Sequence, residues 1–242
     1  LTRAPRCEFN HAQALMCIEE DYLRLTPNPL YGKEFPLMFR LSRSRFEILM
    51  QDVKALQLPY YTTYLDDDGK PVDINGNPTS PFEGRLLHAI KTLAYGVPAH
   101  AFMDYFQMSN EFARQNCKEF DNVMSLLYKE EFLRLPTKED LKAIITLHKE
   151  VVGVDGCFGC LDCTHTYWKN CPKAWQGSYE GKEERPSVVL EAITDHHCFF
   201  WHASYGYAGT LNDINILNLS PFHQTLVNGE FETLEKEAGV VP

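Results

Sequence analysis

The sequence has 242 residues, of which 44% are hydrophobic and 23% charged, and it carries a formal net charge of −10. This length and composition are typical of one large or two modest globular domains, and they exclude disordered, collagen-like and coiled-coil chains. The acidic balance argues against a protein that holds nucleic acid through its net charge alone. Because no apolar stretch approaches the roughly 20 residues of a membrane span, we expect neither a membrane segment nor a secretory signal.

The first 150 residues show helical periodicity, with Ser42 or Ser44 and Thr137 as predicted helix N-caps. A long polar loop is expected over 60–81, between the second and third helices. In chain order, the predicted helices cover 8–25, 42–56, 82–95, 99–106, 109–128 and 137–150.

After Gly153 the pattern changes from helical to extended, which predicts strands over 157–164, 187–194 and 198–205. The last two strands would form a hairpin through Asp195-His196-His197, and Asn212 or Asp213 would cap a following helix. This change of period places a domain boundary near residue 150. We therefore divide the chain into a helical extension (1–36), a helical domain (37–150) and a sheet domain (151–242).

Two aspartates are the candidate metal-binding and catalytic residues. Asp162 falls near the end of the first predicted strand, and Asp213 falls at the start of the helix that follows the hairpin. Each alone is more typical of a turn residue or a helix cap than of a metal ligand. Together they would meet at one edge of the sheet, where carboxylates commonly hold a hard cation such as Mg²⁺.

Two other metal motifs are less consistent with the sequence. Cys157, Cys160 and Cys163 followed by His165 have a spacing that suggests zinc or an iron–sulfur cluster, but in an extended strand Cys160 points away from the other two thiols. The acidic loop 64–79 lacks the glycine and the final glutamate of a calcium-binding EF-hand. We interpret it as a solvated polar loop.

The segment 82–128 has the proportions of a helix-turn-helix, although ordinary helix packing explains the same pattern. Its last helix would present four polar residues to DNA: Asn110, Arg114, Gln115 and Lys118. A second candidate is the aromatic and basic run 167–175, which includes Lys169 and Asn170. This run is either a packed excursion of the chain or a surface that stacks on bases and contacts phosphates.

Short motifs along residues 34–227 carry a resemblance to a known family. In the first part of the chain they lie at 39–46, 93–96 and 132–137. In the second part they lie at 159–165 (GCLDCTH), 168–172 (WKNCP), 174–177, 190–192, 201–203, 206, 212–217 (NDINIL) and 220–221. In this order they resemble the PIF/Harbinger group of transposases and their domesticated nuclease relatives.

The resemblance implies an α/β fold of the α+β kind, in which an all-helical N-terminal region precedes a ribonuclease-H-like DDE domain with a mixed sheet. Asp162 corresponds to the first catalytic Asp of that family, and Asp213 to a further acidic position inferred to hold metal. His165, Lys169 and Asn170 are weaker positioning candidates. The resemblance also implies a divalent metal cofactor, Mg²⁺ or alternatively Mn²⁺, DNA as substrate, a Myb-like companion protein and a nuclear location.

The later Asp and Glu of such a catalytic set normally follow well after this point, so we expect the nuclease domain to be truncated and the 242 residues to cleave little DNA by themselves. The leading hypothesis is a metal-dependent DNA endonuclease or transposase. One alternative is a DNA-binding or protein-interaction module without catalysis. Another is a structural role without DNA contact, which the acidic net charge keeps open.

Overall fold

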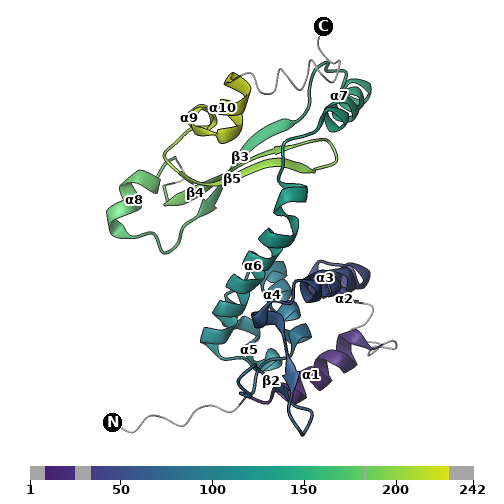
Figure 1. Ribbon diagram of the computed structural model, residues 1–242. Helices are drawn as coiled ribbons and strands as arrows, with labels where there is room; N and C mark the ends of the chain where they lie inside the picture. Colours follow the sequence, from purple (N-terminus) through teal and green to yellow (C-terminus); the bar gives the residue numbers. More distant parts are fainter. Residues whose placement is uncertain (1–8, 25–33, 183, 229–242) are drawn as a thin grey trace. The chain divides into compact units, whose positions relative to one another are not determined.

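The computed structural model describes residues 9–24, 34–182 and 184–228 (Figure 1). The chain divides into two compact units, Leu1–Leu127 and Tyr128–Pro242. The division falls inside a long helix, α6 (Asn110–Phe132), so the boundary predicted near residue 150 lies within the second unit. The physical reason is that Leu141 of α7 (Lys138–Val152) packs into one apolar cluster with Ile193 of the sheet, which ties this helix to the second unit.

The first unit is helical, as predicted. Its helices are α1 (His11–Ile18), the π-turn η1 (Glu19–Leu23), α2 (Phe35–Phe39), α3 (Arg43–Ala55), α4 (Phe82–Tyr95), the 3₁₀ turn η4 (Ala99–Phe102), α5 (Met103–Phe106) and the beginning of α6. The Ser42 hydroxyl accepts a hydrogen bond from the backbone N–H of Arg45, which confirms Ser42 as the N-cap of α3. The core is aromatic and aliphatic, and its fully buried members include Ile18, Phe35, Phe39, Phe46, Leu86, Leu87 and Phe106.

The segment predicted as a long polar loop contains two short elements. A 3₁₀ turn, η3 (Pro59–Tyr61), precedes an antiparallel pair made of β1 (Tyr64–Leu65) and β2 (Pro71–Val72). The Asp66 carboxylate accepts hydrogen bonds from the backbone N–H groups of Asp68 and Lys70, and Asp73 does the same for Asn75 and Asn77. These acids therefore shape tight turns.

The second unit contains an antiparallel sheet of three strands in the order β3–β4–β5. Its strands are β3 (Cys160–Tyr167), β4 (Ser187–Thr194) and β5 (Phe200–Ala208), and its helices are the end of α6, α7, α8 (Lys173–Tyr179), α9 (Asp213–Leu219) and α10 (Pro221–Val227). Figure 1 shows α9 and α10 over one face of the sheet. The predicted α+β class is confirmed, and among the described residues every strand pair is antiparallel.

The predicted hairpin between β4 and β5 is also confirmed, and a buried aspartate closes it. Asp195 accepts backbone hydrogen bonds from His197 at 2.9 Å and Phe199 at 3.0 Å through one carboxylate oxygen. Its second oxygen accepts a bond from the indole N–H of Trp201 at 3.1 Å. One side chain thus accepts hydrogen bonds from the backbone of the turn and from Trp201 at the start of β5.

Burial alternates along β4, which identifies the covered face of the sheet. Ser187, Val189, Glu191 and Ile193 are buried, and the residues between them are only partly so. Residues directly opposite each other in neighbouring strands share a face. Cys163 pairs with Glu191 and so lies on the covered face, whereas Asp162 pairs with Ala192 and lies on the other face.

Among the described residues, no helix is both long and apolar enough to cross a membrane.

Candidate functional site

Asp162 lies near the beginning of β3, because the strand starts three residues later than predicted and runs from Cys160 to Tyr167. The reason is a contact with α7: the Nδ1–H of His148 donates to the Cys157 carbonyl at 2.8 Å, which holds the chain against that helix before the strand begins. The side chain of Asp162 is exposed, and it accepts a hydrogen bond from the N–H of Cys163 at 2.8 Å.

Asp213 is the first residue of α9, and it does not cap that helix. The cap is Asn212, whose side-chain oxygen accepts from the N–H of Asn215 at 2.8 Å. The carboxylate of Asp213 is exposed in the first turn, where the partial positive charge of a helix N-terminus favours an anion.

The two aspartates act on the same thiol. Burial is the main cause that raises the pKa of Cys163, and the negative charges of Asp213, Glu191 and Asp162 raise it further. Within residues 9–24, 34–182 and 184–228, no group of three or more His, Cys, Asp or Glu side chains is arranged to hold a metal ion. Two carboxylates suit an ion such as Mg²⁺, which keeps several of its waters, but they do not form a closed metal cage.

Glu191 was not among the site residues predicted from the sequence. It is fully buried on the covered sheet face, where the Tyr207 hydroxyl donates to its Oε2 at 3.3 Å and the Nε2 atom of His202 lies 3.5 Å from the same oxygen. The other oxygen, Oε1, has no hydrogen-bond partner among the described residues. The sequence signal was present, because Glu191 interrupts the inward apolar positions of an alternating strand.

Cys157, Cys160, Cys163 and His165 lie at different points before and along β3. Cys160 and Cys163 lie on opposite faces of β3, as predicted. Cys157 precedes the strand, so its predicted place on the face of Cys163 does not apply. His165 lies 3.0 Å from the hydroxyl of Ser187 through Nδ1, which holds its ring against β4.

The predicted DNA-contacting residues of α6 all lie on the exposed surface of that helix, whereas Ala113 is buried. They are Asn110, Arg114, Gln115 and Lys118. The last three line a shallow hollow of about 570 Å³ together with Ser109, Glu111 and Phe112. The hollow is lined by the carboxylate of Glu111 as well as by the cations Arg114 and Lys118. Gln115 donates a hydrogen bond to Glu119.

A buried polar network, which was not predicted from the sequence, fixes α6 on α4. The Asn116 amide donates to the Arg85 carbonyl at 2.8 Å and to Nδ1 of His88 at 3.1 Å, and it accepts from the Tyr60 hydroxyl at 3.1 Å. The opposite ring nitrogen of His88 donates to the Ala99 carbonyl at 2.9 Å. The network therefore sets the rotation of α6, and with it the direction that Arg114 and Lys118 face.

The remaining predicted contacts are Lys169 and Asn170. Both are exposed in the turn between β3 and α8. No residue of α8 is buried, so this short helix lies on the surface of the second unit.

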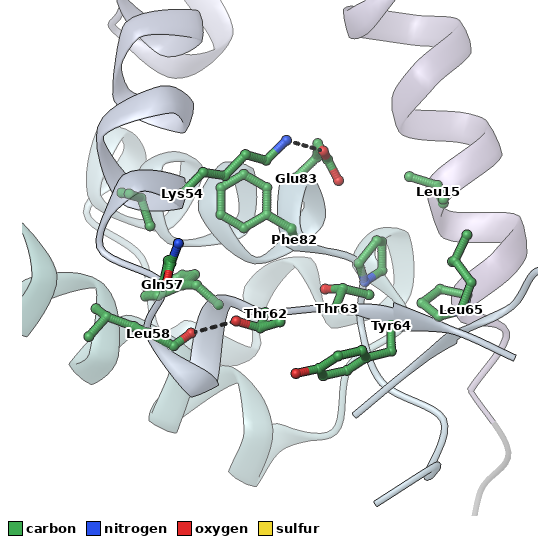
Figure 2. Close-up of a pocket in the computed structure, with 14 residues that line it drawn as sticks. Leu15, Lys54, Gln57, Leu58, Thr62, Thr63, Tyr64, Leu65, Phe82 and Glu83 are labelled. Carbon is green, nitrogen blue, oxygen red and sulfur yellow. Dashed lines mark hydrogen bonds and ion pairs between the residues drawn. The ribbon is translucent and has the colours of Figure 1, made fainter. Parts of the chain in front are cut away.

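A pocket of about 660 Å³ lies in the first unit, next to the ends of α3 and β1 and the start of α4 (Figure 2). Lys54 forms an ion pair with Glu83 at 3.5 Å beside it, and the ammonium group lies 4.7 Å from the centre of the Phe82 ring. None of the predicted metal or DNA residues is among those that line the pocket, so it is separate from the predicted chemistry.

Comparisons with known proteins agree with the predicted resemblance. The family described as plant transposon protein matches residues 130–236, a stretch that contains both Asp162 and Asp213. The chain is 27% identical over 207 residues to Protein ALP1-like from Arabidopsis thaliana. The aligned part covers 82% of this chain and 46% of that relative, so the chain spans about half the length of the curated protein it matches. No solved structure matches the chain. The predicted resemblance is therefore confirmed: this chain is similar to plant transposon proteins and to an ALP1-like protein.

Proposed function

We propose that this chain is part of a metal-dependent DNA endonuclease or transposase of the Harbinger type, in which Asp162 and Asp213 bind the cation. The observation that carries the proposal is that the family match to plant transposon proteins covers the stretch with both aspartates. Asp162 adjoins Cys163 in β3, and Asp213 is close enough to Cys163 for its charge to raise the pKa of the thiol.

A divalent cation, Mg²⁺ or Mn²⁺, would activate water or a DNA 3′-hydroxyl and stabilise the charge on the phosphate. The chain's own residues contribute orientation. The hydrogen bond from the N–H of Cys163 holds the Asp162 carboxylate, and the cap supplied by Asn212 leaves the carboxylate of Asp213 out of the capping interaction. His165, Lys169 and Asn170 are the candidates for positioning DNA near this site.

DNA binding would also use α6, where Asn110, Arg114, Gln115 and Lys118 are exposed on a helix that the Asn116 network holds in place. The arrangement of α4, the short helix α5 and α6 supports the helix-turn-helix interpretation. A Myb-like companion and a nuclear location complete the proposal. A companion that supplies further positive charge would offset the net charge of −10.

The metal claim is tested by titrating the 242-residue chain with Mn²⁺ and measuring the free ion by electron paramagnetic resonance. Asp162→Asn and Asp213→Asn are each expected to weaken binding at least about tenfold, because each removes a charged oxygen ligand. Asp155→Asn is the matched control, since Asp155 is an exposed acid of the same unit that pairs with Lys149. Unchanged Mn²⁺ affinity in both site variants would overturn the metal assignment.

A DNA-binding module without catalysis is the second candidate. It is favoured by the lack of any group of three or more metal-ligating side chains in the described part of the chain. Gel-shift titrations at several salt concentrations separate the two functions. Binding that survives Asp162→Asn, disappears in Arg114→Gln/Lys118→Gln and comes without Mg²⁺-dependent nicking of plasmid DNA would favour the module.

A further inference from the structure

Three aromatic rings gather around α8 at the surface of the second unit. The ring of Trp168 lies 5.0 Å from that of Tyr179, edge to face, and 5.8 Å from that of Trp175. The rings of Trp175 and Tyr179 are nearly parallel, with an angle of 22° between their planes and 6.3 Å between their centres. Trp175 nevertheless remains 53% exposed, so much of its ring is open to a ligand.

The end of α8 packs closely against the segment that follows β5. The Thr210 hydroxyl donates to the Ser178 carbonyl at 2.7 Å, which joins the end of α8 to the segment after β5. Gly181 and Gly209 lie against each other so closely that a Cβ atom on Gly181 would overlap the Gly209 carbonyl. The aromatic rings are therefore held on a fixed support, which lowers the entropic cost of binding a flat ligand.

The stretch between Asp162 and Glu180 has the opposite charge to the whole chain, and the residues after it carry both signs, with Glu180 and Glu184 beside Arg185. Between Asp162 and Glu180 there is no acidic residue, whereas Lys169 and Lys173 are both exposed there. Beside the cluster, the Arg185 guanidinium lies 5.8 Å from the ring centre of Tyr167, which is itself 54% exposed. In a chain with a net charge of −10, this combination of open rings and local cations favours a polyanion that carries flat rings.

We propose that this α8 platform, made of Trp168, Lys169, Lys173, Trp175 and Tyr179, binds unpaired bases of single-stranded DNA. Trp175 supplies the stacking surface, and the two lysines contact the phosphates. An unpaired strand is required because the faces of bases inside a duplex are already stacked on each other. The choice of DNA as the nucleic acid rests on the function proposed above.

The test uses the full chain in EDTA with a fluorescently labelled oligo(dT), and it measures anisotropy together with quenching of tryptophan fluorescence. Quenching is informative because the chain has only 3 Trp residues, of which Trp201 is buried. Trp175→Ala is expected to weaken binding about tenfold or more and to remove most of the quenching, because base–aromatic stacking is broken. Trp175→Phe should keep most of the affinity, since it retains a ring.

Two comparisons make the result specific. Lys169→Gln/Lys173→Gln should flatten the dependence of affinity on salt, because two phosphate contacts are lost. Oligo(dT) binding should persist in Lys142→Gln, which removes an exposed cation of α7 outside the platform. Because the assay contains EDTA, a failure of the proposed metal site leaves this result unaffected. The proposal is overturned if Trp175→Ala binds oligo(dT) like the wild type, if Trp175→Phe loses as much affinity as Trp175→Ala, or if a blunt duplex or oligo(rU) binds more tightly than oligo(dT).

Discussion

Glu191 and His202 face each other on the covered side of the sheet, with 3.5 Å between Oε2 and Nε2. The glutamate side chain is fully buried, and that of the histidine is 16% exposed. A buried carboxylate is costly unless a charge or hydrogen bonds compensate it. Here the Tyr207 hydroxyl donates to the Glu191 carboxylate, and the His202 ring lies beside it. This pair therefore links β4 to β5 through polar atoms inside an otherwise apolar layer.

Removing Glu191 should destabilise the second unit. We expect Glu191→Ala to cost about 3 kcal/mol, because it leaves a cavity and removes the acceptor of the Tyr207 hydroxyl. His202→Ala should cost less, and the double variant should cost less than the sum of the two, with a coupling of about 1 kcal/mol or more. Urea unfolding measures all three, with Glu150→Gln as an exposed acidic control. Strict additivity would mean that the two side chains do not interact.

Arg85 should hold the segment between α3 and α4 in place. It is 3% exposed, and it donates to the Ser80 carbonyl at 2.7 Å, to the Thr79 hydroxyl at 3.1 Å and to the Tyr60 carbonyl. Arg85→Lys loses the planar set of donors, and we expect a cost of about 2 kcal/mol.

The measurement for Arg85→Lys is thermal unfolding combined with limited proteolysis of the 62–78 segment. Cleavage should be faster in this variant than in the wild type. Arg114→Lys, a change of the same type at an exposed position, should leave both readouts close to those of the wild type. Equal cleavage rates in the two variants would contradict the anchoring role.

The first unit should lose stability in mild acid. Burial lowers the pKa of His88, and the hydrogen bond to the Ala99 carbonyl opposes this by a smaller amount. The Asn116 amide donates to Nδ1, which therefore carries no proton in the folded state. The unfolded chain then takes up a proton more readily than the folded one. The contribution of neutral His88 is therefore complete above the ordinary pKa of 6.5, and it is lost as the pH falls through the lower pKa of the folded state.

Chemical unfolding measured between neutral and mildly acidic pH tests this. The free energy of unfolding should fall as the pH drops, and more steeply in the wild type than in His88→Gln, which cannot titrate. Some slope should remain in the variant, because burial and the charge of Arg85 also lower the pKa of His11. Identical slopes in the two proteins would show that His88 is not the titrating group.

The start of α7 should depend on its capping box. The Thr137 hydroxyl accepts from the N–H of Asp140 at 3.2 Å, and the Asp140 carboxylate accepts from the N–H of Thr137 at 2.8 Å and from Arg134 at 2.6 Å. Thr137→Ala should cost about 1 kcal/mol in unfolding experiments, and Thr137→Ser should cost much less because it keeps the hydroxyl. A loss of equal size in both variants would assign the effect to the methyl group instead.

Helices and strands with local signals were predicted well from the sequence. Helix α4 has the predicted bounds because Pro81 precedes it and Gly96 ends it with a positive φ of 59°. Strand β4 also has its predicted bounds, since its side chains alternate between a buried and a partly exposed face. Caps such as Ser42 and Thr137 act within three residues of their own position, so neighbouring residues in the sequence are sufficient to identify them.

The sequence by itself determined the α+β class, the order of the elements and the family resemblance, and it singled out Asp162 and Asp213 as candidate metal ligands. Only the tertiary structure decided where β3 begins, that α7 belongs with the sheet, and that Glu191, Asn116 and Arg85 are buried with polar partners. Asn116 and Arg85 are 31 positions apart in the sequence, and Glu191 and His202 come from two neighbouring strands. Such contacts arise when distant segments pack together, because the cost of burying a polar group is offset only by a partner that the fold brings to it.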